Sequence, residues 1–495
     1  MLGFIKNLCF GAKEEECEKL ECLLKPSRDL INYKLNDPTT PELTVDLPIP
    51  DHPDVMNIRV AGYDPKNLGK PNSYEDQAAN VYATLVRSIN NILPFRKDLK
   101  KWAATKSLKV EPWAGVQLNA YYDRRALKFF YKTDRVSKKT VYTAQSVDIV
   151  AHEMGHALLD AMRPDLWSLQ ALEVWAFHEA FGDINAIATV MLHDDILEYA
   201  LKETNGDLKK HNVISRLAEE MGDAIYNLTG GRGNLKPGAL RNAINDFHYV
   251  PPERLPWNPP QDKLGGEMHN FGRLMAAAWY DIVVAIYEHE VQNGKDEIEA
   301  LHIARDVAYG TIVKGFKHAP ANVRFYNSVA KSMIMVDRME NDGKYGSLIE
   351  HVFHKRRILK PKIKHLCGSM NFKGALSTLT ENDEVTEFEG GKIITRHRPV
   401  ALRLSDSMGI SSQIHNPLFD CELEVPGDVM YEFGSDGRLI QHLENNRAEV
   451  LRNAVVCVKY LDDNKLVGDL DKDLFNVVEG KLVRTKFNCG CRYGE

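Results

Sequence analysis

The residues best suited to chemistry in this sequence are His152, Glu153 and His156, which form the pattern His-Glu-x-x-His. Four residues of helix turn through about 400°, so both imidazoles project from one face, one turn apart. That geometry suits two nitrogen ligands of one tetrahedral zinc ion. Glu153 lies beside the first ligand and can take a proton from a water at the metal without binding the metal, which predicts a general base.

The surroundings of the motif favour a functional site over coincidence. In a chain of this length the pattern arises by chance roughly 1% of the time. Apolar residues flank it on both sides, at 149–151 and 157–159. This flanking pattern predicts the buried helix that such a site requires.

A catalytic zinc needs a third protein ligand and an open fourth position. Glu179 follows His156 by 23 residues, enough for one helix to end, turn and return antiparallel. Asp183 lies one turn beyond Glu179 and is expected to accept a hydrogen bond from the outer nitrogen of His152. Glu173 is the competing third ligand, but no carboxylate follows it one turn later. These positions favour Glu179 as the third ligand.

Two other zinc enzyme classes fit poorly. A metzincin would continue with a glycine and a third histidine, where Leu159 and Met162 stand. An aminopeptidase-type sequence would place Gly-x-Met-Glu-Asn before the zinc helix. Here Met-Glu-Asn occurs only at 339–341, far downstream and without the glycine.

Over roughly residues 73–345 the sequence resembles the thermolysin-like zinc peptidases. Segment 148–156 is similar to that family's zinc helix, and 179–183 to its third-ligand helix. The resemblance implies an α+β fold with a β-rich N-terminal lobe, a helical C-terminal lobe and a zinc cleft between them. It also implies a zinc-dependent endopeptidase with a peptide or protein substrate.

The resemblance extends to residues that would hold the substrate. Asn119-Ala120-Tyr121-Tyr122 looks like the family's edge strand, which implies that the Asn119 side chain and the Ala120 backbone hold an extended peptide by β-strand addition. Arg241 stands like the arginine that grips the substrate carbonyl beyond the scissile bond. Ile149 and Leu240 would line the pocket after that bond, which implies a preference for hydrophobic residues there.

The same resemblance identifies His269 as the residue that stabilises the oxyanion, with Asp262 as the candidate to orient it. Trp167 stands about where the family has a tyrosine that supports the oxyanion; its indole N–H takes over that role or the role is lost. Val190 stands where one calcium-binding carboxylate of the family would fall. One catalytic zinc is therefore expected, and calcium dependence is doubtful.

Two other hypotheses stay open beside the peptidase. The chain could be a zinc-binding scaffold that has lost catalysis, although all three ligands and Glu153 are intact. Alternatively, a β-rich C-terminal domain could bind a partner and target the catalytic part. His397, His415 and His442 are too scattered in the sequence to predict a second metal site there.

The elements that must position these residues can be read from periodicity. A helix is expected over Ser73–Leu93 with Ser73 as N-cap, and strands at Gly115–Tyr122 and Ala126–Tyr131. A mostly helical region is expected over 146–339. Three domains are expected: an irregular arm over 1–72, a catalytic domain over 73–350, and a β-rich domain over 351–495. The strands expected in the last domain include Lys392–Thr395, Val429–Phe433 and Ala454–Tyr460.

Composition narrows the class of protein. At 495 residues with 44% hydrophobic and 27% charged residues, the chain reads as a globular protein of two or three domains. A net charge of −6 argues against a nucleic-acid partner. The longest apolar stretch, Leu274–Tyr287, is too short to span a membrane and carries Asp281. No signal peptide is recognisable, so a cytoplasmic location with reduced cysteines is expected, with export without a recognisable signal as the alternative; the oligomeric state is left open.

Overall fold

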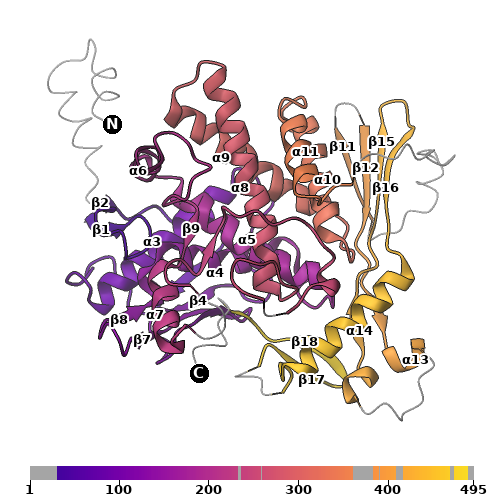
Figure 1. The fold of residues 1–495 in the computed structure, drawn as a ribbon, viewed down its shortest axis with the longest axis horizontal. Helices are drawn as coiled ribbons and strands as arrows, with labels where there is room; N and C mark the ends of the chain where they lie inside the picture. The colour runs from indigo at the N-terminus through magenta and orange to yellow at the C-terminus, as the bar shows by residue number, and fades with distance from the viewer. Residues whose placement is uncertain are drawn as a thin grey trace.

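The computed structural model describes residues 30–231, 236–257, 259–360, 383–388, 391–408, 416–468 and 473–488. Helices and strands both contribute to its architecture, which confirms the expected α+β class. Strands gather in the N-terminal part, long helices fill the centre, and a second group of strands follows in the C-terminal part (Figure 1).

The N-terminal part is built around a five-stranded sheet in the order β19-β5-β6-β4-β3. Its strands are β3 (Ile58–Val60), β4 (Leu108–Glu111), β5 (Ala120–Tyr122), β6 (Ala126–Phe129) and β19 (Phe487–Asn488). β4 runs parallel to β3 and β6, whereas β5 pairs antiparallel with β6 on one side and with β19 on the other. One edge of this sheet is thus made by the C-terminal end of the described chain.

Two hairpins flank this sheet. They are formed by β1 (Leu30–Lys34) with β2 (Thr44–Pro48) and by β7 (Tyr131–Thr133) with β8 (Thr140–Tyr142). The described residues of the segment expected to be irregular, 1–72, therefore contain one hairpin and one strand of the main sheet.

Helix α3 (Tyr74–Ile92) confirms the helix expected over Ser73–Leu93. The Ser73 hydroxyl accepts a hydrogen bond from the Asp76 N–H, which satisfies one of the free donors at the helix start. One side of α3 contacts the first hairpin through a 3.0 Å hydrogen bond between the Tyr33 and Thr84 hydroxyls.

The central part is helical, as expected. It contains η1 (Thr143–Gln145), α4 (Val147–Met162), η2 (Pro164–Leu166), α5 (Leu172–Val190), α6 (Asp194–Thr204), α7 (Glu219–Thr229), η3 (Pro252–Arg254), α8 (Met268–Gln292), α9 (Glu297–His318), α10 (Phe325–Glu340) and α11 (Gly346–Lys355), with the short strands β9 (Arg216–Leu217) and β10 (Arg241–Asn242). α5 is buried along its whole length, and α4 is buried at all but one position. Polar side chains on these two helices must therefore find partners inside the protein. No helix among the described residues is long and apolar enough to cross a membrane.

The C-terminal part contains a four-stranded antiparallel sheet in the order β11-β12-β15-β16. Its elements are β11 (Asp383–Phe388), β12 (Gly391–Arg396), β13 (Val400–Leu402), α13 (Leu404–Met408), η4 (Pro417–Asp420), β14 (Leu423–Val425), β15 (Val429–Gly434), β16 (Leu439–Leu443), α14 (Arg447–Asp463), β17 (Phe475–Val478) and β18 (Lys481–Arg484). β12 and β15 confirm the strands expected at Lys392–Thr395 and Val429–Phe433.

The strand expected at Ala454–Tyr460 is wrong, because these residues lie within α14. The Asn446 side chain caps this helix by accepting from the N–H groups of Ala448 and Glu449. The buried positions recur at helical spacing, which the run of β-branched residues hid; they are Val450, Ala454, Cys457 and Leu461.

Candidate metal centre

The site is formed where α4 and α5 pack closely through a glycine on each helix. A Cβ on Gly155 would lie 2.8 Å from the Gly182 Cα, and a Cβ on Gly182 would lie 2.6 Å from the His152 imidazole. His152 faces Asp183 while His156 lies by Glu179, so the two helices run antiparallel, as expected. The glycine pair lets the backbones approach closely enough for side chains from both helices to reach one point.

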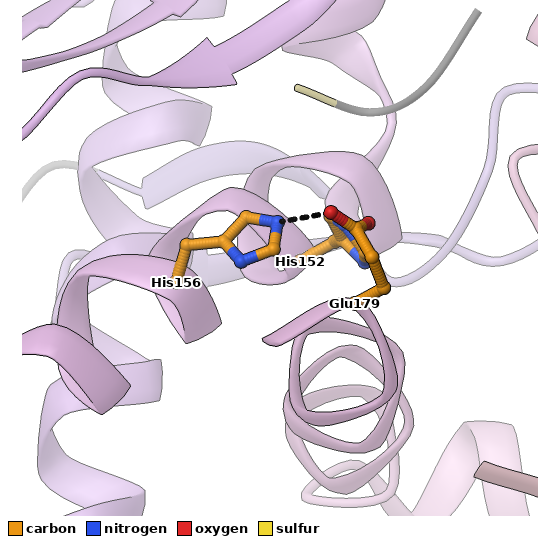
Figure 2. A group of neighbouring side chains, drawn as sticks. All are labelled: His152, His156 and Glu179. Carbon is orange, nitrogen blue, oxygen red and sulfur yellow. Dashed lines mark ion pairs between the residues drawn. The ribbon is translucent and has the colours of Figure 1, made fainter. Parts of the chain in front are cut away.

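The three predicted ligands, His152, His156 and Glu179, meet at that point. His152 Nε2 lies 3.5 Å from Glu179 Oε2, and His156 Nε2 lies 3.8 Å from Glu179 Oε1. The three ligand atoms lie within 4.8 Å of one another, and all three residues are buried (Figure 2). These separations exceed ordinary hydrogen-bond lengths. Two ligands of one tetrahedral zinc at about 2.0–2.1 Å are separated by about 3.4 Å, so the donor set has the spacing of a metal site.

The hydrogen-bond inventory fits a cation at the same point. Within the described ranges, His152 Nε2, His156 Nε2 and both Glu179 oxygens are buried without a hydrogen-bond partner. Buried polar atoms of this kind are costly unless something pairs with them. Two imidazoles and one carboxylate are the donor types that zinc takes in catalytic sites, so these residues fit a zinc ion.

Asp183 contacts His152, the contact expected from the sequence. The His152 Nδ1–H donates to Asp183 Oδ1 at 2.9 Å, which leaves the Nε2 lone pair directed at the metal position. Arg241 Nε–H donates to the same oxygen at 2.8 Å. Burial and the Arg241 charge oppose protonation of His152, but the neighbouring Asp183 and Glu179 carboxylates raise its pKa to about 9. The site thus attracts positive charge.

Glu153 lies next to the ligand His152 on α4. It is fully buried, and neither oxygen has a hydrogen-bond partner among the described residues. Burial raises the pKa of Glu153 to about 8, and the Glu179 charge acts in the same direction while the His152 charge opposes it. A carboxyl that exchanges a proton near neutral pH is suited to general acid and base catalysis.

His269, at the start of α8, reaches the rim of the site. A Cβ on Gly272 would lie 3.0 Å from the Glu179 Cβ, so this glycine lets α8 pack closely on α5. His269 Nε2 lies 3.4 Å from Glu179 Oε2, and its side chain is 14% exposed.

The prediction that Asp262 orients His269 is wrong. Glu267 accepts from His269 Nδ1 at 2.6 Å, whereas Asp262 is an exposed residue that pairs with Lys236 at 3.6 Å. Glu267 was not predicted from the sequence. It is the N-cap residue of α8, two residues before His269, and the resemblance to the peptidase family assigns no role to that position.

Glu173, the competing third ligand, lies outside the metal group. Its Oε1 accepts from the Tyr249 hydroxyl at 2.6 Å and its Oε2 from the Tyr326 N–H at 3.0 Å. Its carboxylate is therefore satisfied elsewhere.

The residues expected to hold substrate lie on or directly before β5, α4 and β10. Ala120 begins β5 and is buried, with Asn119 directly before it. Ile149 lies buried in the first turn of α4, and the partly buried Leu240 precedes Arg241 at β10. The indole N–H of Trp167, offered as an oxyanion donor, donates to the Arg484 carbonyl at 3.1 Å.

A second cluster with metal-ligand residue types, Asp165, His397 and Asp428, joins the central and C-terminal parts. Arg163 contacts Asp165 at 2.7 Å and Asp428 at 3.4 Å, and His397 Nδ1 lies 2.7 Å from Asp428. The guanidinium already supplies the positive charge that these carboxylates need, so the cluster is an ion-pair network.

In comparisons with known proteins, no family model and no curated protein matches this sequence.

Proposed function

We propose that this chain is a zinc-dependent endopeptidase of thermolysin-like architecture, with His152, His156 and Glu179 as metal ligands. The observation that carries the proposal is the convergence of these three buried donors at metal-ligand spacing, beside the uncommitted Glu153 carboxylate. Three protein ligands leave a fourth position open, which is the arrangement of a catalytic zinc.

A zinc ion bound there supplies Lewis-acid chemistry, polarising a substrate carbonyl and acidifying a water. Glu153 takes the proton from the attacking water and later delivers it to the nitrogen of the leaving amine. The complete burial of Glu153 favours this return step, because a desolvated carboxyl holds a proton more readily than a solvated one.

His269 is placed to stabilise the oxygen that gains negative charge. The Glu267 carboxylate at Nδ1 orients the imidazole so that Nε2 faces the site. Asp183 holds both His152 and Arg241, so one carboxylate positions a ligand and the arginine assigned to the leaving-group side.

In this proposal, β5 and the neighbouring residues bind the substrate. An extended peptide adds to the β5 edge through the Ala120 backbone, with the Asn119 amide holding its main chain. Ile149, which is buried in this conformation, and Leu240 are the apolar residues assigned to the side chain after the scissile bond. A peptide-library digest is expected to be enriched in medium aliphatic residues there, and a flat profile would remove this assignment.

The proposal is tested by zinc analysis combined with casein digestion. We expect about one zinc per chain, and a hydrolysis that phenanthroline stops and added zinc restores. Hydrolysis that survives complete zinc removal would contradict the assignment.

The zinc-binding scaffold is the second candidate, and the burial of the site favours it. Glu153 and His156 are 0% exposed, so a peptide has no access to them in this conformation. The two candidates differ in one outcome: a scaffold binds zinc but shows no chelator-sensitive hydrolysis.

A further inference from the structure

The edge of β5 that a substrate would use is already occupied by this chain. β19 pairs antiparallel with β5, with Phe487 opposite Tyr122 and Asn488 opposite Tyr121. The other side of β5 is taken by β6. In Figure 1 the yellow C-terminal segment leaves β18 and crosses toward the N-terminal sheet. β19 therefore occupies the position of an added peptide strand.

Phe487 fills an aromatic pocket that includes a metal ligand. Its side chain is 0% exposed. Its ring stacks on His178 with centroids 4.1 Å apart and on His156 with centroids 5.0 Å apart, and it meets Trp167 edge-on at 5.2 Å. One ring thus covers the face of a zinc ligand.

The backbone before Phe487 is held in an extended form. The Trp167 indole N–H donates to the Arg484 carbonyl, and the Thr485 N–H donates to the Leu474 carbonyl at 2.9 Å. Lys486 Nζ lies 4.9 Å from the centre of the Tyr121 ring. Contacts to main chain and to aromatic faces are those by which a cleft holds a peptide ligand.

The buried position of Arg484 makes the docked state of the C-terminal segment less favourable. Its guanidinium is buried, and within the described part of the chain none of its three nitrogens has a hydrogen-bond partner. It lies over the Phe487 ring at 4.0 Å and the Phe475 ring at 4.3 Å, so these aromatic contacts and the charge of Glu179 are what compensate its burial. A buried cation without hydrogen bonds favours release to water, where the group is solvated.

We propose that Arg484–Asn488 is a tethered peptide ligand of the metal cleft, and that a substrate must displace it. The docked segment also defines the substrate class: extended peptides that place an aromatic side chain in the pocket of His156, Trp167 and His178. The proposal rests on the proposed function, since it assigns the occupant and selectivity of that same cleft.

The first test compares F487A with F433A in the full-length, zinc-loaded chain. Phe433 is the matched control, because it is an equally buried phenylalanine of the C-terminal part that packs with Ile394 in an apolar cluster separate from the main core. We expect phenanthroline to remove zinc from F487A at least about 10-fold faster than from wild type, with F433A close to wild type.

Hydrolysis of a fluorogenic peptide that contains an aromatic residue is expected to rise by a similar factor in F487A. The second test adds the five-residue peptide Arg-Thr-Lys-Phe-Asn, blocked at both ends and labelled, to F487A. We expect binding at least about 10-fold tighter than that of the same peptide with alanine for phenylalanine.

The outcomes separate this proposal from the peptidase itself. Faster zinc removal and aromatic-selective peptide binding without hydrolysis in any variant support the tethered ligand and contradict the peptidase. Chelator-sensitive hydrolysis and zinc removal at equal rates in wild type and F487A support the peptidase and overturn the tethered ligand.

Discussion

Gly155 and Gly182 bring α4 and α5 into backbone contact, with 2.8 Å between the Gly182 Cα and the position of a Cβ on Gly155. The three ligand side chains meet because of this approach. His152 and His156 come from one helix and Glu179 from the other, so separating the helices would separate the ligands.

The first prediction concerns Gly182→Ala. Its added methyl would lie 2.6 Å from the His152 ring and push that ligand out of place. We expect zinc affinity to fall by about 10- to 100-fold, the range seen when the support of a ligand is disturbed. Isothermal titration with zinc measures this loss. Gly310→Ala is the control, because its methyl would meet the Phe95 ring at 2.7 Å, away from the metal group; equal losses in both variants would show that the effect is general destabilisation.

The second prediction concerns Asp183→Asn. The change removes the charge that holds the His152 tautomer and leaves Arg241 buried without its carboxylate. Zinc affinity is expected to fall by about 10- to 100-fold. Asp160→Asn is a matched control: this buried carboxylate on α4 pairs with Arg124 instead. Unchanged zinc affinity in Asp183→Asn would contradict the assigned role.

The third prediction concerns pH and the start of α4. Burial, then the nearby Asp37 charge, raises the pKa of Asp148 from 3.8 to about 7. The Ser146 hydroxyl lies between the two carboxyls and has one proton to donate, so one carboxyl must carry a proton for both contacts to be hydrogen bonds. The folded state therefore binds a proton that the unfolded state releases near pH 4.

The sign follows from this difference. The contribution of the Asp148 proton to the free energy of unfolding is fully present below pH 4. It is lost as the pH rises through about 7. Urea unfolding of Asp148→Asn is expected to show a flatter decline in stability between pH 5 and pH 8 than wild type. Asp98→Asn should keep the wild-type slope, because pairing with Arg96 holds the pKa of Asp98 at about 2. Identical slopes in wild type and Asp148→Asn would exclude the shared proton.

Local patterns predicted the parts of the fold that local forces determine. The Ser73 cap, α3 and the ligand helices follow from caps and periodicity within one segment. The contact between His152 and Asp183 was predictable because both helices are continuous and only one short turn joins them.

Local sequence patterns could not predict the long-range contacts. β19 pairs with a strand more than 360 positions earlier, and two residues of strand carry no periodicity. α14 was predicted as a strand because its β-branched residues outweigh its cap, although burial along one helical face decides its structure. Trp167 was considered for catalysis, but the position of its N–H partner Arg484 depends on the same unpredicted path of the C-terminal segment.

Glu153→Gln in the F487A background tests the central claim most directly, with zinc content and peptide hydrolysis measured on the same preparation. The substitution keeps the shape of the side chain and removes its ability to accept a proton. We predict about one zinc per chain, as in the parent, and hydrolysis lowered by at least about 100-fold, in line with the loss of a general base. Hydrolysis at the parent rate with zinc bound would contradict the account.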